Sequence, residues 1–236
     1  MPKLARFTAP LWDFDTPFYA NDFLNYTTAT DGVTSLAADA GSSVAAGDAR
    51  AGVLVITTGA TDNNEAGVKT TNENYLFLAD TDTYGAAYIQ YAEAATDDAN
   101  VFVGFISAFA ANNLVDDGAG PRTTGSIAGI YKVDGGTVWR CITRNGSAST
   151  DSVSTTTAGG AAYQKLEIEC HEMDGVNMSV TFRVDGKLLK DSSGLVIKHL
   201  VAIASATEMN FGVYAKAGGA NSEVVNVDWI YAHQRR

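Results

Sequence analysis

The sequence predicts an all-β protein built as an antiparallel β-sandwich. Short runs of apolar and β-branched residues recur along most of the chain, and turns rich in Gly, Asn and Asp separate them. No segment shows sustained helical periodicity. Because sandwiches consist of many short strands joined by tight turns, one sandwich accounts for residues 51–236.

The expected strands share alternating or wholly apolar character over lengths typical of strands. They are residues 52–59, 74–80, 83–94, 101–109, 166–173, 177–184, 208–216 and 223–234. Residues 101–109 are apolar on both faces, which is typical of a central strand, and Val101, Val103 and Gly104 favour a strand over a buried helix. Residues 195–206 fit a helix, a strand or irregular structure.

Three Asp-Gly pairs mark turns between these runs. Asp134-Gly135 and Asp185-Gly186 each lie between two alternating segments, and Asp174-Gly175 joins residues 166–173 to residues 177–184. Asp-Gly tolerates positive φ at both central positions of a type I′ turn, so we expect hairpins at these sites.

The first fifty residues differ from the rest and are expected to form an extended arm and loop, followed by the sandwich over residues 51–236. Three of the four prolines lie in the first 17 residues, which disfavours a helix there. Residues 37–50 are small and polar and predict a loop. An ordinary first strand with a loop is the alternative. The aromatic residues that would anchor such an arm to a partner are Trp12, Phe14, Phe18, Tyr19, Phe23 and Tyr26.

Composition excludes several partners. The formal net charge is −11, which argues against nucleic acid and against an anionic membrane surface. Apolar residues make up 46% and charged residues 18%, as in a folded protein with few charges. The N-terminus lacks the apolar core of a secretory signal. This surface-type composition without an export signal predicts a virion component, made in a host cytoplasm and later exposed on a particle.

Two segments carry a resemblance at the level of the fold. Residues 163–189, YQKLEIECHEMDGVNMSVTFRVDGKLL, and the closing VVNVDWIYAHQ resemble strands of concanavalin-like and laminin-G-like jelly rolls. The resemblance implies a jelly-roll β-sandwich. It also raises the alternative function of a lectin-like carbohydrate-binding module that contacts host glycans.

A wider resemblance covers about residues 50–236. The segments TTGATDNNEAGVKTTNE, NNLVDDGAGP, IYKVDGGTVWRC and ATEMNFGVYAKAG resemble structural proteins of tailed-phage virions. This resemblance implies a non-enzymatic protein of the capsid surface, of the decoration, cement or head-fibre type. The implied partners are the major capsid protein or other virion proteins, and a homo-oligomer is expected.

The sequence offers no convincing catalytic site. Glycosidases of this fold carry a Glu-x-Asp-x-x-Glu strand, whereas here Glu167 and Glu169 share a face, Glu172 lies on the other and the central Asp is missing. The two cysteines, Cys141 and Cys170, are expected to be reduced and buried. Trp139 and Trp229 are expected to pack in the core.

No cofactor is expected, and calcium is the one metal for which candidates exist. The three histidines are isolated in sequence, so no zinc site is predicted. Three acidic loops recur, at residues 61–65, 96–100 and 115–118, but none has regular calcium-loop spacing, and Asp and Asn also suit turns. The candidate ligands are Asp97, Asp98, Asp116 and Asp117.

Overall fold

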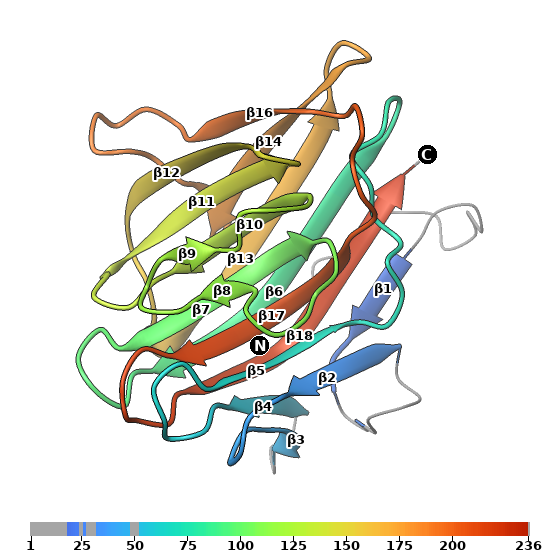
Figure 1. Ribbon diagram of the computed structural model, residues 1–236. Helices are drawn as coiled ribbons and strands as arrows, with labels where there is room; N and C mark the ends of the chain where they lie inside the picture. Colours follow the sequence, from blue (N-terminus) through green and yellow to red (C-terminus); the bar gives the residue numbers. More distant parts are fainter. Residues whose placement is uncertain (1–17, 24–25, 27–31, 48–51, 236) are drawn as a thin grey trace, which may run out of the picture.

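A computed structural model describes residues 18–23, 26, 32–47 and 52–235. All regular elements in these residues are β-strands, and every strand pair is antiparallel, so the predicted fold class is confirmed. Two large sheets face each other (Figure 1). The described residues contain no helix long and apolar enough to cross a membrane.

The larger sheet has nine strands. In spatial order they are β15 (Lys187–Leu188), β14 (Asn177–Val184), β13 (Gly160–Glu172), β6 (Asp82–Ala92), β18 (Val224–Arg235), β4 (Val53–Thr57) and β3 (Ser43–Gly47), with β1 (Phe18–Asn21) beside β18 and β16 (Lys198–Ala202) beside β14. The first described strand therefore pairs with the last strand of the chain.

The second sheet has seven strands and a small addition in front of it. Its order is β12 (Ala148–Thr157), β11 (Val138–Asn145), β10 (Ile127–Lys132), β7 (Ala99–Ile106), β17 (Asn210–Ala217), β5 (Glu65–Thr70) and β2 (Val33–Ala37). The two-stranded ribbon of β8 (Leu114–Val115) and β9 (Gly120–Pro121) lies over this sheet (Figure 1).

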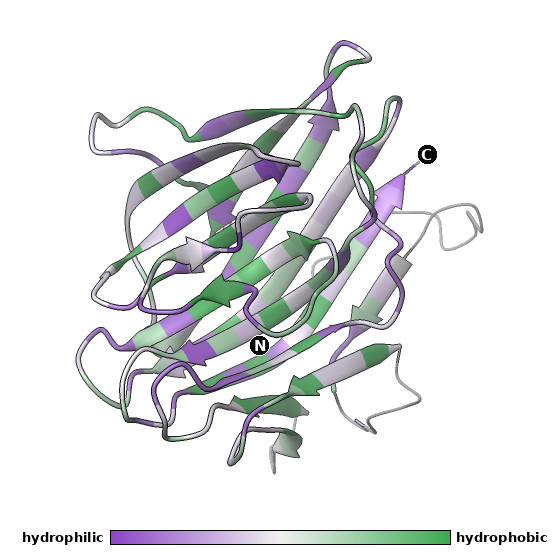
Figure 2. Ribbon diagram, viewed as in Figure 1, coloured by the Kyte–Doolittle hydropathy of each residue, from purple (hydrophilic) through white to green (hydrophobic). Residues whose placement is uncertain are grey.

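The main core lies between the two large sheets. Alternate residues of each strand point into it, among them Trp139, Phe105, Ile168 and Phe211, all fully buried. Polar residues interrupt the apolar ones along strands such as β11 (Figure 2). A second cluster covers the outer face of the seven-stranded sheet: Phe102, Ile106, Phe109, Leu114, Ile127, Tyr131, Ile142 and Tyr214. This sheet is therefore apolar on both faces, as predicted for residues 101–109.

The Asp-Gly turns do not all have the same conformation. Asp185 and Gly186 both have positive φ, 52° and 76°, and join β14 directly to β15, so the type I′ prediction is confirmed there. At Asp134-Gly135 only the glycine has positive φ, and residues 133–137 separate β10 from β11. Bonds from Asp134 N to Asn100 Oδ1 and from Gly135 N to the Asp97 carbonyl tie this longer loop to its neighbour.

The segment expected to form an arm and loop contributes three strands to the sheets. β1, β2 and β3 pair with β18, β5 and β4, so the loop predicted at residues 37–50 is wrong over Ser43–Gly47. β3 is an edge strand of small residues, which gives no apolar pattern to recognise. Residues 32–47 thus belong to the sandwich predicted for residues 51–236.

Two further predictions need correction or completion. Residues 74–80 form no strand; Tyr75 makes a single bridge to Met209, and Tyr75 and Phe77 fill the core from an irregular segment. Large buried aromatics here anchor a loop, which a run of apolar residues alone does not distinguish from a strand. Within residues 195–206 the structure has the strand β16.

Candidate functional site

The outer face of the nine-stranded sheet gathers aromatic and charged side chains on three neighbouring strands. The core takes Leu166 and Ile168 from β13 and Ile89 from β6, so the alternate residues of these strands point outward. We call this surface the aromatic–acid face and define it by Asp82, Tyr84, Tyr88, Tyr163, Glu167, Glu169, His171, Trp229, Tyr231 and His233.

A β-bulge in β18 explains why sequence reasoning missed part of this face. Val227 pairs with Ile89 and Trp229 with Tyr88, so Asp228 is an extra residue. The bulge changes the alternation: Val225 and Val227 point into the core, but so do Ile230 and Ala232. Trp229 therefore lies half-buried on the outer face, and the prediction that it packs in the core is wrong. Trp139 is fully buried as predicted.

Three aromatic rings form a row across the sheet. Tyr88 on β6 lies between Tyr163 on β13, with ring centroids 5.0 Å apart, and Trp229 on β18, with ring centroids 6.0 Å apart. All three side chains are half-buried. Next to the row, the amides of Asn226 and Gln90 hydrogen-bond to each other. The row thus combines rigid rings with polar groups at its edge.

A second aromatic group lies further along the same strands. The Tyr84 ring centroid is 5.8 Å from that of Tyr231 and 5.9 Å from that of His233. Tyr84 Oη donates a 2.7 Å hydrogen bond to Glu167 Oε1. Burial, reinforced by this bond to Glu167, raises the pKa of Tyr84, which keeps the phenol protonated. Tyr84 is therefore a fixed donor beside the carboxylates.

Donors of the same chain already engage Glu167. Besides Tyr84, it accepts a 3.0 Å bond from Gly186 N and pairs with Lys165 Nζ at 2.9 Å. The side chain is nearly fully buried under these partners. As predicted, Glu167 and Glu169 occupy outward positions of one strand, and Glu167 serves to order its surroundings.

His171 connects two acids at the end of the face. Its Nδ1 lies 2.9 Å from Asp82 Oδ1 and its Nε2 lies 3.2 Å from Glu169 Oε1. Burial opposes protonation, but these two carboxylates together outweigh it and raise the pKa of His171. Glu169 also pairs with Arg183 at 3.5 Å. This end of the face is a network of alternating charges.

The cysteines lie as predicted. Cys170 faces the core while its neighbour His171 is exposed, so the two form no dyad. Cys141 and Cys170 are both free and buried, and burial raises the pKa of each thiol. Buried, protonated thiols act as small apolar side chains.

Other groups of the protein contact each calcium candidate, through the carboxylates of Asp98 and Asp116 and through the backbone of Asp97 and Asp117. Asp116 forms an ion pair with Lys216, the Asp117 backbone N–H donates to Asn63 Oδ1 at 3.2 Å, and Asp98 accepts a 3.2 Å bond from Asn221. The Asp97 carbonyl accepts from Lys132 Nζ. Within residues 18–23, 26, 32–47 and 52–235 there is no group of three or more His, Cys, Asp or Glu side chains placed to hold a metal ion.

The aromatic residues proposed as partner anchors have different positions. Phe23 is 1% exposed in the core of its own chain, and Tyr19 and Tyr26 pack against that core. Phe18 belongs to β1. Trp12 and Phe14 lie outside the described residues. Phe23 thus serves this chain's own core rather than a contact surface.

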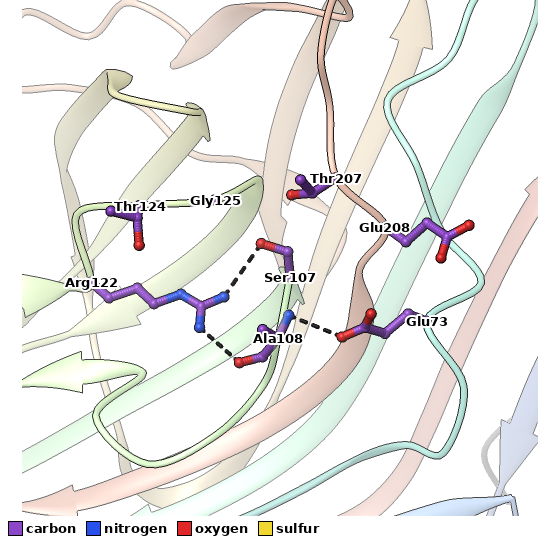
Figure 3. A pocket seen from close by; sticks show the side chains of 8 residues that line it. All are labelled: Glu73, Ser107, Ala108, Arg122, Thr124, Gly125, Thr207 and Glu208. Carbon is purple, nitrogen blue, oxygen red and sulfur yellow. Dashed lines mark hydrogen bonds between the residues drawn. The ribbon is translucent and has the colours of Figure 1, made fainter.

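A hollow of about 330 Å³ lies among the segments that follow β7 and precede β10 and β17 of the seven-stranded sheet (Figure 3). Glu73, Ser107, Arg122 and Glu208 line it together with small residues. Arg122 donates to the Ala108 carbonyl at 2.7 Å and to Ser107 Oγ at 3.4 Å, and Ala108 N donates to Glu73 Oε1 at 3.0 Å. Arg122 thus holds its own loop. Among the described residues no aromatic side chain lines the hollow, so the aromatic–acid face is the better candidate site.

Comparison with known proteins establishes the fold alone. No family model and no curated protein matches the sequence. Among solved structures, the endo-1,3-β-glucanase of Streptomyces sioyaensis is similar at TM-score 0.59 and 12% identity, covering 96% of this chain and 99% of that chain. Peanut lectin is similar at TM-score 0.53 and 10% identity, covering 93% and 97%. The chain has a concanavalin-like jelly-roll fold.

Lectin domains recur among these similar structures. The metal-free carbohydrate recognition domain of Emp46p has a TM-score of 0.59 and 8% identity, covering 90% of this chain and 94% of that chain. These identities are too low to transfer a site residue by residue.

Proposed function

We propose that this protein is a non-catalytic carbohydrate-binding module whose site is the aromatic–acid face. The row of Tyr163, Tyr88 and Trp229 carries the proposal, because it places three rings on adjacent rigid strands. Sugar rings have apolar C–H faces and hydroxyl edges. Aromatic rings bordered by amides and carboxylates match both parts.

The strands support this use of the row in two ways. Rings held on a sheet lose little conformational freedom when a ligand binds, which favours affinity. The bulge at Asp228 brings Trp229 onto the outer face, where its ring belongs to neither core cluster of the described residues. Lectins and a glucanase among the similar structures show that this fold supports carbohydrate recognition in other proteins.

The carboxylates favour binding over catalysis. A glycosidase needs one carboxyl group as general acid and a second as base or nucleophile, both free to reach the substrate. Here the oxygens of Glu167 are occupied by Tyr84, Gly186 and Lys165, and Glu169 is shared between His171 and Arg183. These contacts fix the acids in place as hydrogen-bond acceptors.

A glycan array tests the proposal. The full chain should retain a subset of oligosaccharides, and Trp229→Ala should weaken that binding by ~10-fold or more, the loss of one well-placed aromatic contact. Leu195→Ala is the matched control, because Leu195 is 67% exposed and lies outside the face. Equal binding by both variants would overturn the assignment of the site, and melting curves confirm that each variant is folded.

We also propose a place for the protein on a virion, supported by the resemblance of residues 50–236 to tailed-phage structural proteins. A jelly roll on a capsid surface is compatible with glycan contact, so both roles can belong to one protein. Quantitative mass spectrometry of purified particles of the source virus is the test. Copies in the hundreds indicate a decoration protein, a few dozen or fewer indicate a fibre, and absence would contradict the virion role.

A further inference from the structure

A buried lysine contacts two carboxylates and a carboxamide beneath the loop between β7 and β10, which covers the seven-stranded sheet. Lys216 on β17 is fully buried. Its Nζ lies 2.8 Å from Asn112 Oδ1 and 3.6 Å from Glu65 Oε2, and it also contacts the Leu114 carbonyl and the Asp116 carboxylate. Glu65 is 3% exposed. Leu114, Phe109 and Tyr214 belong to the apolar cluster around this group.

Glu65 is the centre of the group. Both of its oxygens accept from Asn112 N, at 3.0 and 2.9 Å, and Tyr214 Oη donates to Oε2. Burial raises the pKa of Glu65 despite these donors and the nearby Lys216. A carboxyl group in this position can accept a proton from the lysine and pass it on.

The backbone conformation of Asn112 and its hydrogen bonds to Glu65 fix the position of this residue in the loop. Its φ of 58° is in the left-handed region, which Asn tolerates better than most residues, and its bonds to Glu65 fix the loop there. The carbonyl carbon of its side chain is one bond beyond the Oδ1 atom that contacts Lys216. The rest of Asn112 lies at the surface, so a leaving group has a route to water.

We propose that Lys216 and Asn112 form an intramolecular isopeptide bond with Glu65 as proton carrier. Glu65 takes a proton from the Lys216 ammonium, and the neutral Nζ attacks Cγ of Asn112. Glu65 then transfers this proton to Nδ2, the Cγ–Nδ2 bond breaks and ammonia leaves. Glu65 takes the second proton from Nζ, which becomes the amide nitrogen, and this proton leaves with the ammonia as ammonium. One C–N bond replaces another, no oxidant is needed, and the product is an amide between β17 and the loop.

Asn112, not Asp116, is the electrophile. The Asp116 side chain is 55% exposed, so water stabilises its carboxylate, and a carboxylate anion resists attack by an amine. The Asn112 carboxamide carries no charge. Bond formation also removes the charge of an ammonium group that is otherwise costly to bury.

The chain contains two controls, each lacking one part of the group. Lys132 is buried and pairs with Glu93, but its other contacts are the backbone carbonyls of Asp97 and Ala99. Lys69 lies 3.3 Å from Asn210 Oδ1, and among the described residues it forms no ion pair. Both lysines should remain free.

Mass spectrometry of the purified full chain tests the bond. The intact mass should be lower than the sequence mass by one ammonia, and digestion should give one peptide pair joined through Lys216 and Asn112. Glu65→Gln should restore the full mass, whereas Lys69→Arg should not. If Glu65→Gln does not fold, the digest of the unmodified chain still decides. An unlinked Lys216 peptide, or loss of water with linkage to Asp116, would overturn the proposal.

Discussion

His199 should make the protein less stable in acid. It lies on β16, close to β11 and β12 of the other sheet, and it is 2% exposed. Its Nδ1 lies 3.2 Å from Thr143 Oγ1 and its Nε2 lies 3.0 Å from Ser152 Oγ. The Phe182 ring packs against it with centroids 5.1 Å apart. The imidazole thus joins the two sheets.

Burial lowers the pKa of His199 from 6.5 to about 4, and the nearby carboxylate of Asp151 only partly opposes this. Between these values the unfolded chain binds a proton that the folded chain does not, so stability falls as the pH falls below 6.5. From pH 7 to pH 4 this difference amounts to about 3 kcal/mol of unfolding free energy.

Urea unfolding at several pH values measures this loss. His199→Asn retains one hydrogen-bonding group and cannot be protonated, so its unfolding free energy should fall less than that of the unmodified chain between pH 7 and pH 4. His171→Asn is the control of opposite sign. The raised pKa of His171 stabilises the fold below pH 6.5, and this contribution is lost as the pH rises through the folded pKa. If the unmodified chain and His199→Asn lose stability in parallel, the reasoning about His199 fails.

Three other predictions concern packing, register and metal. Gly85→Ala should cost about 1–3 kcal/mol in urea unfolding, since a Cβ there would come within 2.4 Å of Phe211 and 2.7 Å of Phe105. Deleting Asp228 removes the bulge residue and should leave a cooperatively folding protein. Deleting Tyr231 reverses the faces of the residues after it and should prevent folding. Circular dichroism melts that show the Asp228 deletion to be the more damaging of the two would contradict the register. Calcium should not shift the melting temperature, because in the part of the chain that the structure describes the Asp side chains at residues 97–98 and 116–117 belong to no group of three or more metal-ligating side chains. A clear shift would contradict this reasoning.

Alternation and turn chemistry were enough to predict the sandwich. The pattern of residues 166–184 gives both the faces and the pairing of β13 and β14, and Asp185-Gly186 gives the turn that follows. The strand β3 is not predicted from the sequence, because its small side chains give no apolar pattern. The strand predicted for residues 74–80 is wrong, because an irregular segment places Tyr75 and Phe77 in the core.

The candidate site could be predicted only in part. The alternation of side chains along a strand is enough to predict that Glu167 and Glu169 lie on one face. The outward position of Trp229 is not predictable in this way, because a bulge depends on how β18 pairs with β6. The alternation of β18 by itself places the Trp229 ring in the core. The Lys216 group joins Lys216 to residues 100 or more positions away, for which the sequence offers no local signal.

Nuclear magnetic resonance of the indole N–H groups tests the central claim most directly. With an oligosaccharide retained on the array, the Trp229 resonance, assigned through Trp229→Phe, should shift during titration. The Trp139 resonance should stay in place, since that indole is fully buried and donates to Gln164 Oε1 at 3.1 Å. Binding that leaves the Trp229 resonance unmoved would contradict the claim that the aromatic–acid face is the carbohydrate site.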